Sequence, residues 1–181
     1  MTNFINMPGF KLDMVEQIIE VDENDNQIGL RPKCDFFKSK HIHRASHLIL
    51  FNSKDEILLQ HRMPTKKVWP DLFTFSVDCT VADESYEECI QREMQEEIGI
   101  SIDVKRLFNF PYFGNIDKAR HCVFFGRSDD KIIPDKREIQ MIKWIDADEL
   151  KDDILKNPGI YVPPFVEGMK KYFDEFYRTE K

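Results

Sequence analysis

The stretch that decides the fold reads ESYEECIQREMQEEIGI and covers residues 84–100. Within it, Ile90, Met94 and Ile98 recur at intervals of four residues. That spacing is typical of the apolar stripe of an amphipathic helix. The pattern predicts a helix over residues 83–98.

Both ends of this predicted helix carry their own signals. Ser85 and Glu88 have the spacing of a capping box, in which each side chain bonds to the backbone of the other residue. Gly99 stands where helices commonly end in a left-handed residue. The helix therefore has a defined beginning and a defined end.

Three glutamates share one side of the predicted helix. Glu97 is four residues from Glu93, and Glu96 is three residues from it, so all three project over one narrow sector. Like charges at this spacing repel, which destabilises the helix unless a cation lies among them. Mg²⁺ prefers hard oxygen ligands and shares its coordination shell with substrate phosphates and water. From spacing alone the alternative is a solvated acidic face, which is the commoner meaning of a charge run.

The wider pattern resembles the Nudix box, G-x5-E-x7-R-E-apolar-x-E-E-x-G-apolar. The matching positions after the leading glycine are Glu84, Arg92, Glu93, Met94, Glu96, Glu97, Gly99 and Ile100. The resemblance implies an α/β fold, a Nudix α/β/α sandwich with a mixed β-sheet. It also implies hydrolysis of a nucleoside diphosphate linked to another group, or of a related diphosphate. The implied cofactor is Mg²⁺, with Mn²⁺ as the alternative ion.

The resemblance also implies roles for individual residues. Glu93, Glu96 and Glu97 would be the metal ligands, and Glu96 and Glu97 would belong to the catalytic group together with Arg92. Arg92 would orient the carboxylates, and Glu84 would support the loop that leads into the helix.

One position departs from the box, because its leading glycine is replaced by Asp78. Glycine permits unusual backbone conformations, and aspartate tolerates left-handed geometry better than most residues do. The shape of this loop is therefore open. An additional carboxylate near the metal is the second interpretation of Asp78.

Beyond the helix, alternating and β-branched runs predict strands bounded by turn clusters. The predicted strands cover residues 15–21, 27–30, 45–51, 57–61, 73–81, 100–113, 121–127 and 139–145, with helices over 147–155 and 165–177. This order indicates a mixed sheet between helices. We expect residues 1–12 to be a flexible N-terminal tail and residues 13–181 to form a single Nudix domain.

Composition limits the partners and the compartment. The net charge of −7 argues against a nucleic-acid-binding protein, which usually has a basic surface. The four cysteines contain no C-x-x-C pair, which favours free thiols in a reducing compartment. No apolar run approaches the length of a membrane helix, and no signal peptide is visible. We expect a cytoplasmic protein with a small-molecule diphosphate substrate and no nucleic-acid or membrane partner; a homodimer is left open.

Most of residues 15–180 resemble one branch of the Nudix superfamily, the isopentenyl-diphosphate delta-isomerases. The segments that carry this resemblance are 43–51, 58–62, 69–74, Glu138 with Trp144, and 163–165. That isomerase protonates and deprotonates an alkene with a Cys and a Glu, and it holds a metal with three His and two Glu.

Several of the isomerase residues are missing here. His43 matches one of the three histidines, while the other two fall at Phe36 and Cys79, and the catalytic cysteine falls at Val77. A small shift of the alignment would give Cys79 a catalytic role, although a buried small residue is the commoner meaning. Loss of a positioned proton donor costs about 10²–10⁴-fold in rate. We therefore favour a hydrolase over the isomerase. The third hypothesis is a non-catalytic Nudix module that binds a metabolite, and Asp78 in place of the box glycine keeps this hypothesis open.

Residues outside the box complete the predicted site. Glu138 is either a further metal ligand or the base that deprotonates the attacking water. Arg62, Lys66 and Lys67 are candidates for contact with the diphosphate, against the alternative of a solvated basic loop.

Three histidines lie close together in the sequence, at positions 41, 43 and 47. Alternate residues of a strand share one face, so His41, His43 and His47 could converge on a second metal. The alternative places His47 in the packed sheet and His41 at the surface.

Overall fold

The computed structural model describes residues 16–36 and 41–180, so the predicted N-terminal tail over residues 1–12 lies outside the described residues. The strands are β1 Gln17–Val21, β2 Gln27–Pro32, β3 Ile42–Phe51, β4 Glu56–Arg62, β5 Phe73–Thr74, β6 Val77–Thr80, β7 Lys105–Phe113, β8 Lys118–Arg127 and β9 Ile139–Asp146. The helices are α1 Tyr86–Glu93, α2 Ala147–Lys156, α3 Pro163–Glu175 and α4 Tyr177–Glu180. Shorter helical turns are η1 Lys33–Phe36, η2 Met94–Ile98 and η3 Pro158–Ile160.

Strand β3 organises the sheet. It pairs in parallel with β8 from His43 to Phe51. It also pairs antiparallel with β6, and with β1 and β4 at its two ends. Strand β8 carries β7 on its other side, and β4 carries β9, both antiparallel. The predicted mixed sheet is confirmed.

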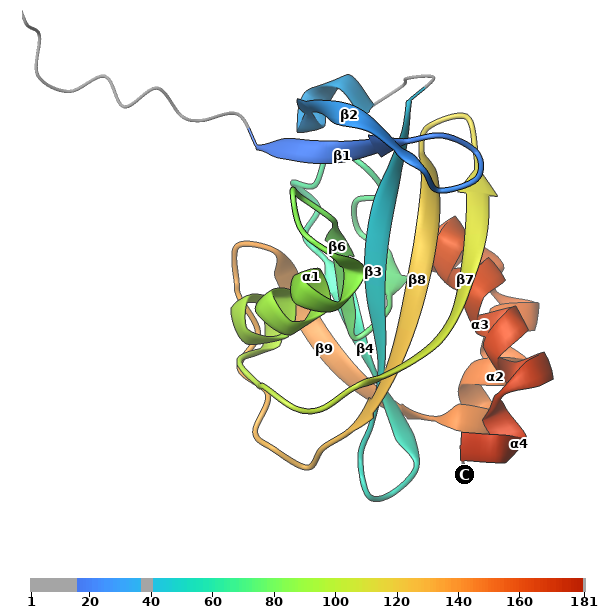
Figure 1. The fold of residues 1–181 in the computed structure, drawn as a ribbon. Coiled ribbons are helices and arrows are strands. Elements are labelled where there is room, and N and C mark those ends of the chain that lie inside the picture. Colours follow the sequence, from blue (N-terminus) through green and yellow to red (C-terminus); the bar gives the residue numbers. More distant parts are fainter. Residues whose placement is uncertain (1–15, 37–40, 181) are drawn as a thin grey trace, which may run out of the picture.

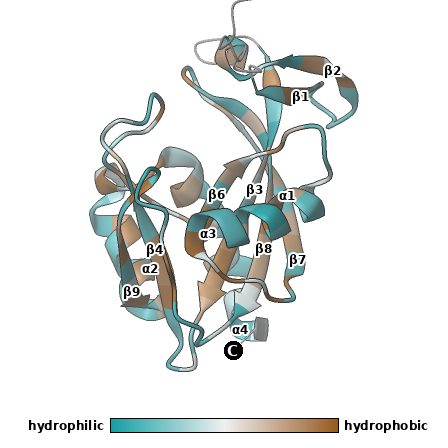
Figure 2. Ribbon diagram, turned by 90° about the vertical axis from the view of Figure 1, so that its left-hand side faces the viewer, coloured by the Kyte–Doolittle hydropathy of each residue, from teal (hydrophilic) through white to brown (hydrophobic). Residues whose placement is uncertain are grey.

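The two faces of β3 are covered by different helices, as Figure 1 shows with α1 on one side of the sheet and α2 and α3 on the other. Because successive strand residues point to opposite faces, Leu48 and Leu50 pack in the cluster that contains α1 and η2. Ile49 and Phe51 pack in the cluster that contains α2 and α3. Figure 2 shows hydrophobic colour along β3, β6 and β8 through the middle of the molecule. The α/β/α sandwich is confirmed.

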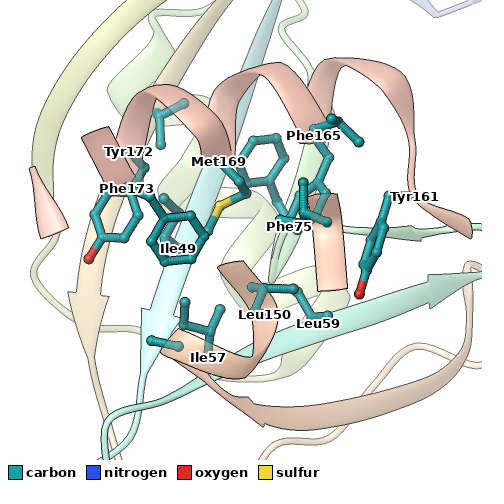
Figure 3. Packing of buried hydrophobic residues seen from close by; sticks show 14 of the residues in the cluster. Ile49, Ile57, Leu59, Phe75, Leu150, Tyr161, Phe165, Met169, Tyr172 and Phe173 are labelled. Atoms are coloured by element: carbon teal, nitrogen blue, oxygen red, sulfur yellow. The ribbon is translucent and has the colours of Figure 1, made fainter. Parts of the chain in front are cut away.

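Helix α3 contributes Phe165, Tyr172 and Phe173 to the aromatic core on its side. Figure 3 shows its buried side chains against residues of the sheet and of α2. The labelled residues are Ile49, Ile57, Leu59, Phe75, Leu150, Tyr161, Phe165, Met169, Tyr172 and Phe173. Each such side chain contributes about 1.5–3 kcal/mol when fully buried. Gly168 permits the close approach, since a Cβ there would lie 2.9 Å from Cζ of Phe75.

The central helix is confirmed in outline and differs in its second half. Ser85 and Glu88 form the capping box, and Gly99 ends the helix with φ 73°. Residues Met94–Ile98, however, form a π-helical turn rather than a continuation of α1. Single π-turns occur frequently at functional sites. Within this turn Glu97 is buried and Glu96 is exposed.

Two predicted strands also differ from the structure. The run over residues 73–81 is divided into β5 and β6 by Phe75 and Ser76. The Ser76 hydroxyl donates to the Leu58 carbonyl at 2.7 Å and accepts from the Leu50 amide at 2.9 Å, while the Ser76 amide donates to the Leu48 carbonyl at 3.0 Å. Strand β7 begins at Lys105, five residues later than the predicted start at residue 100. In the described part of the chain, no helix is both long and apolar enough to cross a membrane.

Candidate active site

Arg92 joins the carboxylates of the central helix. Its Nη2 donates to Oε1 of Glu84 at 2.5 Å. Its Nη1 donates to Glu93 at 2.8 Å and to Glu96 at 3.1 Å. Charge-assisted bonds of this kind are short and directional. One guanidinium therefore ties the start of the helix to two of the three predicted metal ligands.

Glu97 is the buried member of the three, with 5 % of its surface exposed. Its Oε2 accepts from the Gln60 side chain at 3.1 Å and from the Asp78 amide at 3.2 Å. Burial raises the pKa of Glu97 well above its usual range, and the neighbouring charges of Glu93, Asp78 and Glu138 raise it further. Partial burial likewise raises the pKa of Glu93, against the opposing charge of Arg92.

This donor set fits a hard divalent cation. Glu93, Glu96, Glu97 and Glu138 all line one pocket and supply only carboxylate oxygens. Like charges crowded in a partly buried space favour protonation unless a cation lies among them. Mg²⁺ takes such oxygen ligands and leaves positions for substrate and water.

Glu138 lies at the same pocket, where Lys66 donates to its Oε2 at 2.5 Å. The Glu138 carbonyl accepts from the Met63 amide at 3.0 Å, which ties the loop after β4 to the segment before β9. Lys67 lines the pocket with an exposed side chain. The structure thus brings Glu138, Lys66 and Lys67 to the pocket that holds the box glutamates.

Arg62 has a structural task that the sequence did not reveal. Its Nε donates to the Trp69 carbonyl at 3.0 Å and its Nη2 donates to the Val68 carbonyl at 3.0 Å. Its Nη1 donates to Asp78 at 3.2 Å. Arg62 lines the pocket, so phosphate contact stays a prediction, but the guanidinium also fixes the loop over residues 63–72.

Asp78 resolves the departure from the Nudix box. Asp78 lies in β6, and it is not one of the described residues whose backbone φ is positive. The backbone at this position therefore does not require glycine. Its carboxylate accepts from Thr74 at 2.8 Å and lies 3.2 Å from Nδ1 of His47. Although burial alone would raise the pKa of Asp78, the contacts with His47, Arg62 and Thr74 hold it well below its usual range. Asp78 is therefore a half-buried charge that joins β6, β4 and β3.

The histidines form separate pairs rather than one metal site. His41 lies against Glu20, and Nε2 of His43 lies 2.8 Å from Asp117. Nε2 of His47 lies 2.7 Å from Nδ1 of His121. Within the residues that the structure describes, no histidine belongs to a set of three metal-ligand atoms within 4.8 Å of one another. The convergence of His41, His43 and His47 on a second metal, which the sequence left open, is not found among the described residues, and His47 is packed in the sheet as in the alternative.

The inner part of the pocket carries stacked rings. Phe75 stacks on His47 at 4.5 Å between ring centroids, His47 on His121 at 5.0 Å, and His121 on Phe110 at 4.8 Å. Burial lowers the pKa of His121 well below its usual range, so this ring is neutral. The four rings come from neighbouring segments of the sheet and form one continuous stack, of which Phe75, His47 and His121 line the pocket.

One cavity of about 680 Å³ contains both the carboxylates and an apolar wall. The wall is made by Phe75 from the sheet and by Val162, Pro164 and Phe165 at the start of α3. Trp69 lies at the same cavity, from the loop that Arg62 fixes. Concave sites in which convergent polar groups meet apolar side chains are typical of small-molecule sites.

The residues that distinguish the isomerase branch lie mostly in the core. Val77, at the position of the isomerase cysteine, is fully buried, and Phe36 is 3 % exposed. Cys79 does line the pocket, and its Sγ lies 3.2 Å from Sγ of Cys89. A catalytic thiol at position 77 is thus replaced by a core side chain.

Sequence reasoning missed several residues in and beside this pocket. Gln60 holds Glu97 from outside the pocket lining, and its signal is a glutamine inside the apolar run of β4, which indicates a buried polar contact. Asp117 and His121 gave no local signal, because their partners lie on another strand more than seventy residues away.

Comparison with known proteins gives a consistent picture. The NUDIX domain family model matches residues 41–163. A "prenyl-diphosphate phosphatase" of Methanosarcina mazei is 46% identical over 162 residues, covering 87% of this chain and 95% of the relative. An "isopentenyl-diphosphate Delta-isomerase 1" of Aromatoleum aromaticum is 33% identical over 156 residues, covering 82% of this chain and 87% of the relative.

Solved structures share the fold. A crystal structure of a Deinococcus radiodurans protein has a TM-score of 0.74 at 24% identity, covering 86% of this chain and 98% of that chain. A MutT protein of Methanosarcina mazei has a TM-score of 0.65 at 19% identity, covering 75% and 96%. At these identities the likeness concerns the fold alone.

Proposed function

The chain belongs to the Nudix family of diphosphate hydrolases, and we propose that it is a Mg²⁺-dependent enzyme whose substrate is a prenyl diphosphate. The observation that carries this proposal is the continuity of the pocket. Carboxylates suited to a cation and a diphosphate open directly onto the apolar wall of Phe75, Val162 and Phe165. The similarity to a prenyl-diphosphate phosphatase supports the choice of substrate class.

In this proposal Glu93, Glu96 and Glu97 hold the cation, with Mn²⁺ as the alternative to Mg²⁺. When bound, the ion neutralises phosphoryl charge and lowers the pKa of a water molecule. Arg92 keeps Glu93 and Glu96 in place through its two bonds from Nη1. Gln60 and the Asp78 amide keep Glu97 turned into the pocket.

Glu138 is proposed as the base that takes a proton from the attacking water. Lys66 occupies Oε2 of Glu138, which leaves Oε1 as the atom that accepts the proton. Lys66 and Lys67 lie where they can offset the charge of the outer phosphate. Arg62 acts on the same region by holding the loop that carries both lysines.

The apolar wall suits a hydrocarbon chain. Burying apolar surface contributes about 25 cal/mol per Å², and the half-buried Trp69 offers such surface at the cavity that Val162, Pro164 and Phe165 also line. We therefore narrow the wider expectation of a nucleoside diphosphate linked to another group to a prenyl diphosphate.

Isomerisation is disfavoured by two described positions. Val77 is a fully buried core residue where the isomerase resemblance requires a thiol, and Phe36 replaces an expected metal ligand. Without a positioned acid the alkene is not protonated at a useful rate.

A substrate screen tests the proposal. Isopentenyl, geranyl and farnesyl diphosphate, nucleotide sugars, dinucleotides and nucleoside triphosphates are incubated with the protein and Mg²⁺ or Mn²⁺, and released phosphate and the organic product are identified. We expect phosphate release to be fastest from prenyl diphosphates. Preferential turnover of nucleotides would overturn the substrate class, and dimethylallyl diphosphate formed from isopentenyl diphosphate without phosphate release would restore the isomerase.

A further inference from the structure

Two thiols and one carboxylate meet beside the proposed magnesium site. Cys79 comes from β6, while Cys89 and Glu93 come from α1. Their ligand atoms all lie within 4.8 Å of one another, and the two sulfurs are 3.2 Å apart. Both thiols are buried, and Cys79 lines the wall of the pocket, which gives a dissolved ion a route to them.

The chemistry of this group differs from that of its neighbours. Thiolates favour soft or borderline cations such as Zn²⁺, whereas Mg²⁺ takes oxygen ligands only. Two Zn–S bonds of ordinary length at a tetrahedral angle place the sulfurs about 3.8 Å apart. The sulfurs of Cys79 and Cys89 reach that separation by small rotations of their side chains.

The surrounding charge is suited to such an ion. Two thiolates and the carboxylate of Glu93 carry three negative charges, one more than a divalent ion neutralises. Arg92 balances the excess, since its Nη1 lies 2.8 Å from Glu93 and its Nη2 lies 4.0 Å from Sγ of Cys89.

We propose that Cys79, Cys89 and Glu93 bind Zn²⁺, and that the bound ion inhibits the hydrolase. Each thiol releases its proton to solvent as its sulfur–metal bond forms. Glu93 is the residue that both sites need, so a zinc ion that holds Glu93 competes with Mg²⁺. The inhibition rests on the proposed function, whereas the binding of the ion does not.

Cobalt titration of the full-length, metal-free protein tests the binding without any substrate. Co²⁺ stands in for Zn²⁺ because a thiolate ligand gives it a near-ultraviolet charge-transfer absorption that carboxylates do not give. With reductant present and Mg²⁺ absent, we expect this absorption to saturate at one ion per chain and to disappear when Zn²⁺ is added.

Variants assign the absorption to this site. Removing an outer partner of a ligand costs about 10–100-fold in metal affinity, so removing a ligand itself should cost more than about 100-fold. We expect that loss in Cys79→Ser and in Cys89→Ala. Cys122→Ala is the matched control, because Cys122 is equally buried and lies outside the group. Its titration should match that of the wild type.

Absence of the absorption in the wild-type protein would overturn the inference, and so would its persistence in both cysteine variants. The second arm measures hydrolysis at limiting Mg²⁺ with increasing Zn²⁺. We expect inhibition that Mg²⁺ relieves in proportion to its concentration, and inhibition indifferent to Mg²⁺ would contradict the competition. If the protein hydrolyses no prenyl diphosphate, the proposed function fails but the cobalt result still stands. If the protein hydrolyses prenyl diphosphates but does not bind Co²⁺ through sulfur, only the zinc site fails.

Discussion

The two ends of the pocket, the box end with the carboxylates and the inner end with the aromatic rings, affect the stability of the fold in opposite ways. At the box end, Glu93 and Glu96 bind Arg92 while Glu97 is buried beside Glu93, and the repulsion between these carboxylates opposes folding. At the inner end, Phe75 and Phe165 with stacked histidines bury apolar surface and favour folding. Changes at the box end should therefore remove activity toward every substrate without loss of stability. Changes at the inner end should lower the stability of the protein and alter its substrate selectivity.

The largest effect is expected at the box end, from Glu97→Gln. Loss of a cation ligand should lower kcat/KM by at least about 100-fold for every substrate, because a metal contributes several kcal/mol of charge stabilisation. The raised pKa of Glu97 means that its ionised form is less stable in the folded chain than in the unfolded chain. The variant should therefore have a higher Tm than the wild type in EDTA at neutral pH.

Steady-state kinetics and calorimetry of both proteins measure these two effects. A Glu97→Gln protein that retains its activity, or one that loses activity only because it unfolds, would break the contrast between the two ends. Glu88→Gln is the matched control, since Glu88 is an exposed glutamate of the same helix whose change should cost only capping stability.

At the inner end, Gly168→Ala should destabilise the protein by about 1–3 kcal/mol, since overpacking in a filled core costs that much. A Cβ at this position meets Cζ of Phe75 at 2.9 Å and Cζ of Phe110 at 3.1 Å. Gly159→Ala is the matched control, because a Cβ there meets nothing within 4 Å. Urea unfolding of the three proteins measures the difference, and equal midpoints for the two variants would show that α3 is not packed as closely as described.

Phe165→Leu tests selectivity at the apolar wall. The smaller side chain enlarges the cavity beside Val162, so kcat/KM for farnesyl diphosphate relative to isopentenyl diphosphate should change by roughly tenfold, as for a change of about one methylene in an apolar pocket. Competition assays with mixed substrates give the ratio directly. If all prenyl substrates lose rate equally, the prenyl chain does not contact this wall.

The smallest effect is a pH dependence at the His43–Asp117 pair, which also lines the pocket. Burial alone would lower the pKa of His43, but its bond with Asp117 outweighs burial and raises the pKa above 6.5. The stabilisation is therefore fully present below pH 6.5 and is lost as the pH rises through the folded-state pKa. The free energy of unfolding of the wild type should exceed that of His43→Gln by more at about pH 6 than at about pH 8. A difference in the free energy of unfolding that does not vary with pH would show that His43 is not charged in its pair with Asp117.

Much of the box end could be predicted from the sequence, because it lies in one continuous segment. The capping box, the left-handed Gly99 and the grouping of Glu93, Glu96 and Glu97 all follow from spacing along a helix. The π-helical turn could not be predicted, since its five residues carry the same apolar pattern as an α-helix.

The inner end could not be predicted, because its contacts depend on strand register. The pairing of His47 with His121 requires β3 and β8 to lie parallel at one particular offset. The carbonyl partners of Arg62 exist only after the loop over residues 63–72 has folded back. The role of Asp78 also could not be predicted, because its strand backbone and its contacts with Arg62, Thr74 and His47 depend on the folded structure.

The most direct test is a crystal structure of the protein with Mg²⁺ and a prenyl diphosphate analogue that resists hydrolysis. The account predicts a metal bound by Glu93, Glu96 and Glu97, the diphosphate beside Lys66, and the hydrocarbon chain against Phe165 and Val162. A diphosphate bound away from those glutamates, or a chain directed into solvent, would contradict it.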